Sequence, residues 1–115
     1  MVVGLFHTGI NDSNKTNGLL NDATREIARQ VPGFDVIFYG HDHSTHYEEV
    51  TSADGSKTII VNPANNAMKV ADAELEVSKK GRSKELKVNI VDMGKRSVDE
   101  RYMKTFEKEI EEGKR

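Results

Sequence analysis

Apolar runs alternate with polar segments along the first forty residues. One run covers Val2–Phe6, and a second covers Asp35–Tyr39, in which only the first residue is charged. Continuous runs of β-branched and other apolar residues are typical of strands that are buried on both faces, as in a parallel sheet. Residues 8–18 between them are rich in glycine, asparagine and aspartate, which indicates a loop. The pattern therefore predicts two buried strands with a polar segment between them.

A helix is expected between that loop and the second strand. Apolar residues recur there at helical spacing, so that they would share one face: Leu20, Ala23, Ile27 and Val31. The helix should end before Pro32, because proline disfavours the α conformation in the residue that precedes it. The order strand, helix, strand predicts a parallel βαβ unit with a right-handed crossover.

The second half of the chain has a different pattern. Thr58–Val61 is a short apolar strand, and Pro63–Asn66 is a turn-rich break. Apolar residues then alternate with polar ones in 71–77 and again in 86–90, with Lys79–Arg82 between them as a turn. Alternation of this kind predicts an antiparallel hairpin that buries one face.

A charged helix is expected at the C-terminal end. Ser97 and Glu100 have the spacing of a capping box, in which each side chain accepts a hydrogen bond from the other residue's backbone N–H. Apolar residues form one stripe along this helix: Val98, Tyr102, Phe106 and Ile110. Its other faces are charged, so the helix should pack on a neighbour or lead into another domain. We therefore divide the chain into 1–95 and a linker helix over 96–115. The elements together predict an α/β fold, bordering on α+β, with a mixed sheet.

Composition narrows the class of protein. The chain has 115 residues, a net charge of −2 and 36% hydrophobic residues, which suits one small polar domain or part of a larger one. The balanced charge gives no electrostatic case for binding nucleic acid or an anionic membrane, and no apolar run approaches the roughly 20 residues of a membrane span. The absence of cysteine excludes disulfides and thiolate metal ligands. The chain opens on a strand without the features of a signal peptide, so we expect Met1 to be a start placed inside a longer protein.

Three of the four histidines lie where chemistry is expected. His7 and His41 each follow a predicted parallel strand, at the edge where ligands of open α/β sheets collect. His43 is two residues further on, and Gly40 permits a tight turn that would bring both rings toward one site. A single histidine at a strand end is usually a hydrogen-bonded structural residue, so it is the combination that indicates a site. Imidazole is a suitable ligand for Mn, Zn, Fe and similar ions.

Two segments around these histidines resemble a known family. Phe6–Gly9 and Val31–His43 are similar to the fourth and fifth signature blocks of the calcineurin-like metallophosphoesterases. The Val-Pro-Gly-Phe-Asp sequence that opens the second block resembles the branch of 5′-nucleotidases and 2′,3′-cyclic-nucleotide 2′-phosphodiesterases. Val61–Pro63, the hairpin that contains Leu75 and the helix at Ser97 also fit that branch. The resemblance covers nearly the whole chain and is strongest in the first two segments.

The resemblance implies a binuclear metal centre. His7 and His41 would ligate one ion and His43 the other, with two divalent ions such as Mn, Zn or Fe in the parent protein. Two such ions can clamp a phosphate and supply hydroxide for in-line attack. The implied activity is hydrolysis of phosphate esters, with a nucleotide or cyclic nucleotide as substrate. The family resemblance also implies a parent that is secreted, periplasmic or on the cell surface.

Other polar residues have lesser expected roles. Four of them are expected behind the ligands or along the pocket: Gly40, Asp42, Asn62 and Asn65. The asparagines are the weaker candidates, because asparagine-rich turns are usually only turns. His46 matches no ligand of the family, so we expect an exposed loop residue there.

Part of the family pattern is absent from the chain. It contains neither an Asp-x-His nor an Asn-His sequence, so three of the expected ligands are present and the bridging carboxylate is not. The resemblance therefore implies the C-terminal part of a catalytic domain, which we expect to be inactive alone and to bind at most one ion weakly. The cut would leave a sheet edge uncovered, and uncovered edges pair with other chains. We expect a homodimer through that edge or through the C-terminal helix.

Two interpretations from other classes stay open. The chain could be a non-catalytic binding module of phosphoesterase-like fold, which would bind its partner without metal. It could also hold a structural metal site that protein ligands close on all sides, although three histidines without cysteine or a nearby carboxylate argue against this. A serine or cysteine nucleophile has no support, since the chain has no cysteine and no Gly-x-Ser-x-Gly elbow.

Overall fold

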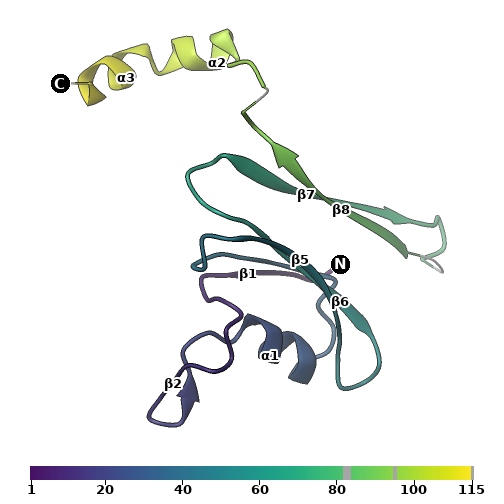
Figure 1. Ribbon diagram of the computed structural model, residues 1–115. Helices are drawn as coiled ribbons and strands as arrows, with labels where there is room; N and C mark the ends of the chain where they lie inside the picture. The colour runs from purple at the N-terminus through teal and green to yellow at the C-terminus, as the bar shows by residue number, and fades with distance from the viewer. Residues whose placement is uncertain (82–83, 95, 115) are drawn as a thin grey trace.

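A central mixed sheet organises the molecule. The computed structural model describes residues 1–81, 84–94 and 96–114. Its main sheet has the strand order β1 (Val3–Phe6), β4 (Val36–Tyr39), β6 (Lys57–Pro63) and β5 (Thr45–Thr51). β1, β4 and β6 run parallel, whereas β5 is antiparallel to β6. The parallel pairing of the first two predicted strands is confirmed, and so is the mixed α/β class (Figure 1).

The helix α1 (Thr24–Gln30) covers one face of this sheet (Figure 1). It ends before Pro32, as predicted, but its buried residues are Thr24 and Ala28. The predicted apolar stripe was therefore wrong in part: Leu20 lies before the helix, and Val31 is its half-exposed C-terminal cap. The reason is that contacts with the loop after β1 fix where the helix begins. The spacing of apolar residues within the helix does not predict such contacts.

The segment expected to be a loop contains a small ribbon. β2 (Lys15–Thr16) pairs with β3 (Leu19–Leu20) in antiparallel fashion. The two residues between them, Asn17 and Gly18, have φ angles of 54° and 79°. Two successive positive φ angles at Asn-Gly are the signature of a tight hairpin turn.

The strand β5 was not predicted. Its sequence is mostly polar and charged, and only Val50 is fully buried in it. It pairs along its whole length with β6, which is longer than the predicted Thr58–Val61 because it includes Pro63. Asp54 and Gly55 form the turn between the two strands, where Gly55 has a φ of 86°.

The second hairpin covers the other face of the sheet. It consists of β7 (Lys69–Val77) and β8 (Lys84–Asp92), which are antiparallel as predicted. Its inward side chains pack on Val36, Ile59 and Val61 of the sheet; they are Ala71, Ala73, Leu86, Val88 and Ile90. Of the predicted turn, Arg82 lies outside the described residues.

The C-terminal segment forms two short helices instead of one. They are α2 (Glu100–Thr105) and α3 (Glu107–Gly113), which join at Phe106 and project away from the sheets (Figure 1). The predicted capping box was wrong, because the cap is Asp99, whose carboxylate accepts hydrogen bonds from the N–H groups of Arg101 and Tyr102. An aspartate placed directly before the first turn satisfies those donors better than a serine two residues further away. No helix in the described part of the chain is both long enough and apolar enough to cross a membrane.

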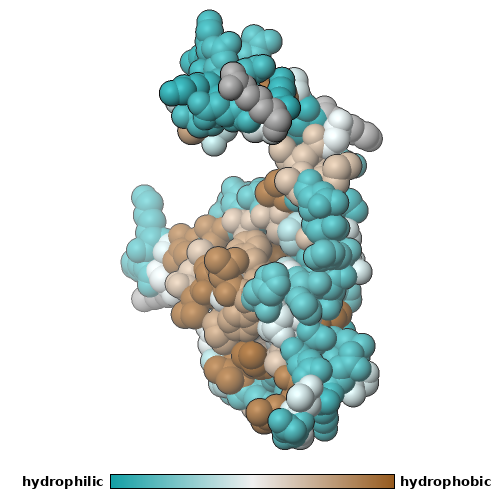
Figure 2. All heavy atoms as spheres, turned by 90° about the vertical axis from the view of Figure 1, so that its left-hand side faces the viewer, coloured by the Kyte–Doolittle hydropathy of each residue, from teal (hydrophilic) through white to brown (hydrophobic). Residues whose placement is uncertain are grey.

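One apolar part of the sheet is uncovered. Val3 and Leu5 of the edge strand β1 are 46% and 86% exposed. Phe6 packs against the core cluster that includes Ala28 of α1, so alternation along the strand places Val3 and Leu5 on the opposite face, which the hairpin covers elsewhere. Figure 2 shows a broad apolar region on the side of the molecule that lies to the left in Figure 1.

Candidate functional site

Two histidines meet at the carboxyl edge of the parallel strands. Phe6 is in register with Tyr39, and the N–H of Gly40 donates to the carbonyl of Phe6 at 3.2 Å. The next residues, His7 and His41, therefore leave adjacent strands side by side. Their ring centroids are 5.3 Å apart with an interplanar angle of 66°. The structure thus brings together two of the three predicted ligands.

The turn that carries His41 and His43 has an unusual backbone. The two histidines have φ angles of 78° and 54°, a left-handed conformation that costs free energy for residues other than glycine. The sequence suggested that Gly40 would supply the special angles, which was wrong, because Gly40 does not have a positive φ. The strain falls on the histidines themselves, and strain of this kind is concentrated at functional sites.

Two carboxylates next to the histidine turn accept hydrogen bonds from the backbone of the loop after β1. Asp22 is buried; its Oδ1 accepts a hydrogen bond from the N–H of Gly9 at 2.9 Å and lies 3.9 Å from Nε2 of His41. Asp42, expected behind the ligands or at the surface, is half-buried, and its Oδ2 accepts from the N–H of Ile10 at 3.0 Å. Sequence reasoning missed Asp22, for which the only signal was an acidic residue just before the predicted helix.

The described residues do not form a complete metal centre. Among them, no group of three or more His, Asp or Glu side chains is arranged to hold a metal ion. His43 is exposed at its own left-handed position. Two facing imidazoles are fewer ligands than the three or four that zinc sites use. The roles of His7, His41 and His43 as metal ligands therefore stay predictions.

The expected pocket residues are distributed differently from the prediction. A hollow of about 440 Å³ lies beneath the histidine turn, between the sheet and the second hairpin. Gly40 is on its wall, together with apolar residues that include Leu5, Phe38 and Pro63. Asn62 is fully buried, and its Oδ1 accepts from the N–H of Ala64 at 2.9 Å. Asn65 accepts from Met68 through its backbone carbonyl, in a turn.

His46 was expected in an exposed loop, which was wrong. It lies in β5, is partly buried, and its Nε2 is 3.1 Å from Glu48 Oε1. Arg25 of α1 binds the same carboxylate with two nitrogens, at 2.8 and 2.9 Å, and also donates to the carbonyl of Ile10 at 3.2 Å. The hydrogen bond from Arg25 lowers the pKa of Glu48 to about 2, and the same pairing raises the pKa of Arg25. This ion pair ties β5, α1 and the loop after β1 together.

Tyr39 is a buried polar residue directly below the turn. Its Oη and Nδ2 of Asn62 are buried without a hydrogen-bond partner among the described residues. Burial, and secondarily the charge of Asp42, raise the pKa of Tyr39 to about 12, while the nearby amide of Asn62 acts in the opposite direction. The raised pKa keeps the phenol neutral at physiological pH.

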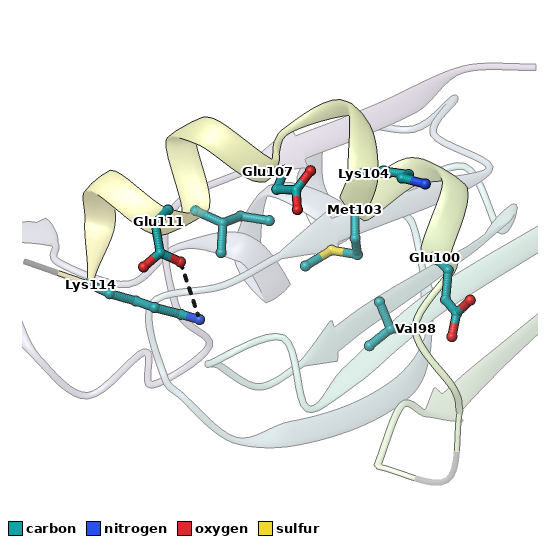
Figure 3. Close-up of a pocket in the computed structure, with 8 residues that line it drawn as sticks. Val98, Glu100, Met103, Lys104, Glu107, Glu111 and Lys114 are labelled. Carbon is teal, nitrogen blue, oxygen red and sulfur yellow. Dashed lines mark ion pairs between the residues drawn. The ribbon is translucent and has the colours of Figure 1, made fainter.

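A second hollow lies far from the histidines. The groove of about 410 Å³ along α2 and α3 is lined by Val98, Met103 and Ile110 together with charged side chains. Figure 3 labels Val98, Met103 and the charged residues. Glu111 and Lys114 form an ion pair of 4.0 Å at one end. No histidine lines this groove, so it does not belong to the candidate site.

Comparison with known proteins identifies the fold. No protein-family model matches the chain, and no curated protein matches it. Among solved structures, the chain is similar to the calcineurin-like phosphoesterase YfkN from Bacillus subtilis, with a TM-score of 0.62 and 20% sequence identity. The match covers 89% of this chain and 34% of that one, so the chain spans about a third of that structure's length. The mixed sheet with its helix and hairpin is therefore part of the calcineurin-like phosphoesterase fold, as the sequence predicted.

Proposed function

We propose that this chain contributes part of the active site of a metal-dependent phosphoesterase that hydrolyses a nucleotide or cyclic nucleotide. The observation that supports this most is the convergence of His7 and His41 at the carboxyl edge of a phosphoesterase-like sheet. Active sites of open α/β sheets lie at this edge. Bound divalent ions would supply the polarisation of the phosphate ester.

The roles of the residues in this chain follow from their positions. His7 and His41 place their rings side by side at this edge of the sheet, and His43 follows on the same turn. Asp22 and Asp42 hold the backbone from which these rings project. Because the described residues offer no complete ligand set, the proposal includes inactivity of the chain alone.

Hydrolysis of a chromogenic phosphodiester with added Mn²⁺ tests the proposal. The chain alone should release no product above a blank. A longer polypeptide that adds the missing Asp-x-His and Asn-His sequences should be active, and His41→Ala should abolish that activity while His46→Ala leaves it. Equal activity of the longer polypeptide with and without His41 would exclude the proposed role of the histidine pair.

A non-catalytic binding module is the second candidate, and the incomplete ligand set favours it. It would bind its partner without metal, and binding would survive the double substitution of His41 and His43 by alanine. A metal requirement for binding would count against this alternative.

A further inference from the structure

Asp42 connects the two loops that carry the histidines. Oδ2 of Asp42 accepts a hydrogen bond from the N–H of Ile10, while its other oxygen lies over Gly9. A Cβ atom added to Gly9 would be 1.9 Å from Asp42 Oδ1, which is far below any real contact. Gly9 must therefore lack a side chain for the carboxylate to occupy this position.

The backbone under Asp42 is itself fixed to helix α1. The N–H of Gly9 donates to Asp22 at 2.9 Å, and its carbonyl accepts from the N–H of Thr24 at 3.1 Å. The hydroxyl of Thr24 donates to the carbonyl of Thr8 at 2.8 Å. Because the buried Thr24 belongs to the first turn of α1, these hydrogen bonds attach the loop after β1 to the helix.

Asp42 lies between two residues whose backbone conformations need stabilising contacts from their surroundings. His41 and His43 flank it, and both have left-handed backbone angles. Such conformations persist only where surrounding contacts over-determine them. The Asp42 carboxylate ties the middle of this turn to the loop that follows His7.

We infer that Asp42 is a positioning residue, whose carboxylate sits on the Gly9–Ile10 backbone and holds the His41 ring against the ring of His7. The inference rests on the proposed function only for its consequence in hydrolysis. The geometry of the ring pair can be measured without metal or substrate, so its failure is distinguishable from failure of the proposed function.

The test is a nuclear Overhauser contact between the ring protons of His7 and His41 in the folded chain. Asp42→Ala should abolish this contact, since the turn loses its attachment. Asp42→Asn should keep it, because the amide oxygen still accepts from the N–H of Ile10. Asp54→Ala is the matched control: like Asp42, Asp54 accepts a hydrogen bond from a backbone N–H, here that of Ser56, but it lies in an exposed turn outside the site.

Gly9→Ala tests the same contact by changing the loop after β1. It should displace Asp42 and weaken the ring contact in the wild-type background, and it should add no further loss in the Asp42→Ala background. If Asp42→Ala does not fold, Asp42→Asn and Gly9→Ala still decide the matter. The inference is overturned if the ring contact survives Asp42→Ala, if Asp42→Asn loses it as fully as alanine does, or if Gly9→Ala leaves it unchanged.

Discussion

Replacement of Glu48 by glutamine should lower the free energy of unfolding in a way that depends on pH. Pairing with Arg25 lowers the pKa of Glu48 from its ordinary 4.5 to about 2. That difference corresponds to about 3 kcal/mol at about 1.36 kcal/mol per pKa unit. The side chains of Arg25 and Glu48 are 21% and 28% exposed, and solvent screens such pairs. We therefore expect a loss of about 1–2 kcal/mol at pH 7.

The sign of the pH dependence follows from the lowered pKa. Because the folded state holds the carboxylate ionised more strongly than the unfolded state, the stabilisation is fully present above about pH 4.5 and is lost as the pH falls toward 2. Less than half of it should remain at about pH 3. Urea titrations of wild type and Glu48→Gln at pH 7, 5, 4 and 3 measure the difference directly, with Glu49→Gln on the exposed face of the same strand as the control. A difference that is the same at pH 3 and pH 7, or one no larger than the control's, would refute the reasoning.

Three further predictions concern stability and association. Tyr39→Phe should leave the free energy of unfolding unchanged or raise it by up to about 1 kcal/mol in urea titrations, because it removes a buried hydroxyl without a described partner. A loss above about 2 kcal/mol would mean that the hydroxyl has a partner. Asp99→Ala should cost about 1 kcal/mol of helix stability and lower the helical circular dichroism signal, since it removes the cap of α2; Ser97→Ala is the matched control, and an equal loss there would mean that Asp99 is not the cap. Leu5, the most exposed apolar residue of the edge strand, should promote self-association at high protein concentration in sedimentation, and Leu5→Lys should reduce it; a monomeric wild type would contradict this.

Much of the fold could be predicted because its information is local. The apolar runs that become β1 and β4 are buried on a sheet, and the order strand, helix, strand makes their pairing parallel. The meeting of His7 and His41 follows from the same fact, since residues after adjacent parallel strands share one edge.

The remaining features depend on contacts between distant segments. The polar sequence of β5 resembles that of a loop. It forms a strand with a partly buried Glu48 because that carboxylate pairs with Arg25 of α1, which lies 23 residues earlier in the chain. Asp22 contributes through its hydrogen bond with the N–H of Gly9 and its proximity to His41, and neither contact leaves a pattern in the sequence. The C-terminal cap was misplaced for a different reason: Ser97 and Asp99 are both good caps, and the backbone geometry alone decides between them.

The most direct test of the central claim is the response of the four histidine ring signals to Mn²⁺, a paramagnetic ion that broadens the signals of nearby protons. We predict that His7 and His41 broaden together at the lowest concentrations of Mn²⁺, that His46 stays sharp because its ring is bound to Glu48, and that His41→Ala protects the signal of His7. Equal broadening of all four histidines, or broadening of His7 that is unchanged by His41→Ala, would contradict a shared metal-binding role for the pair.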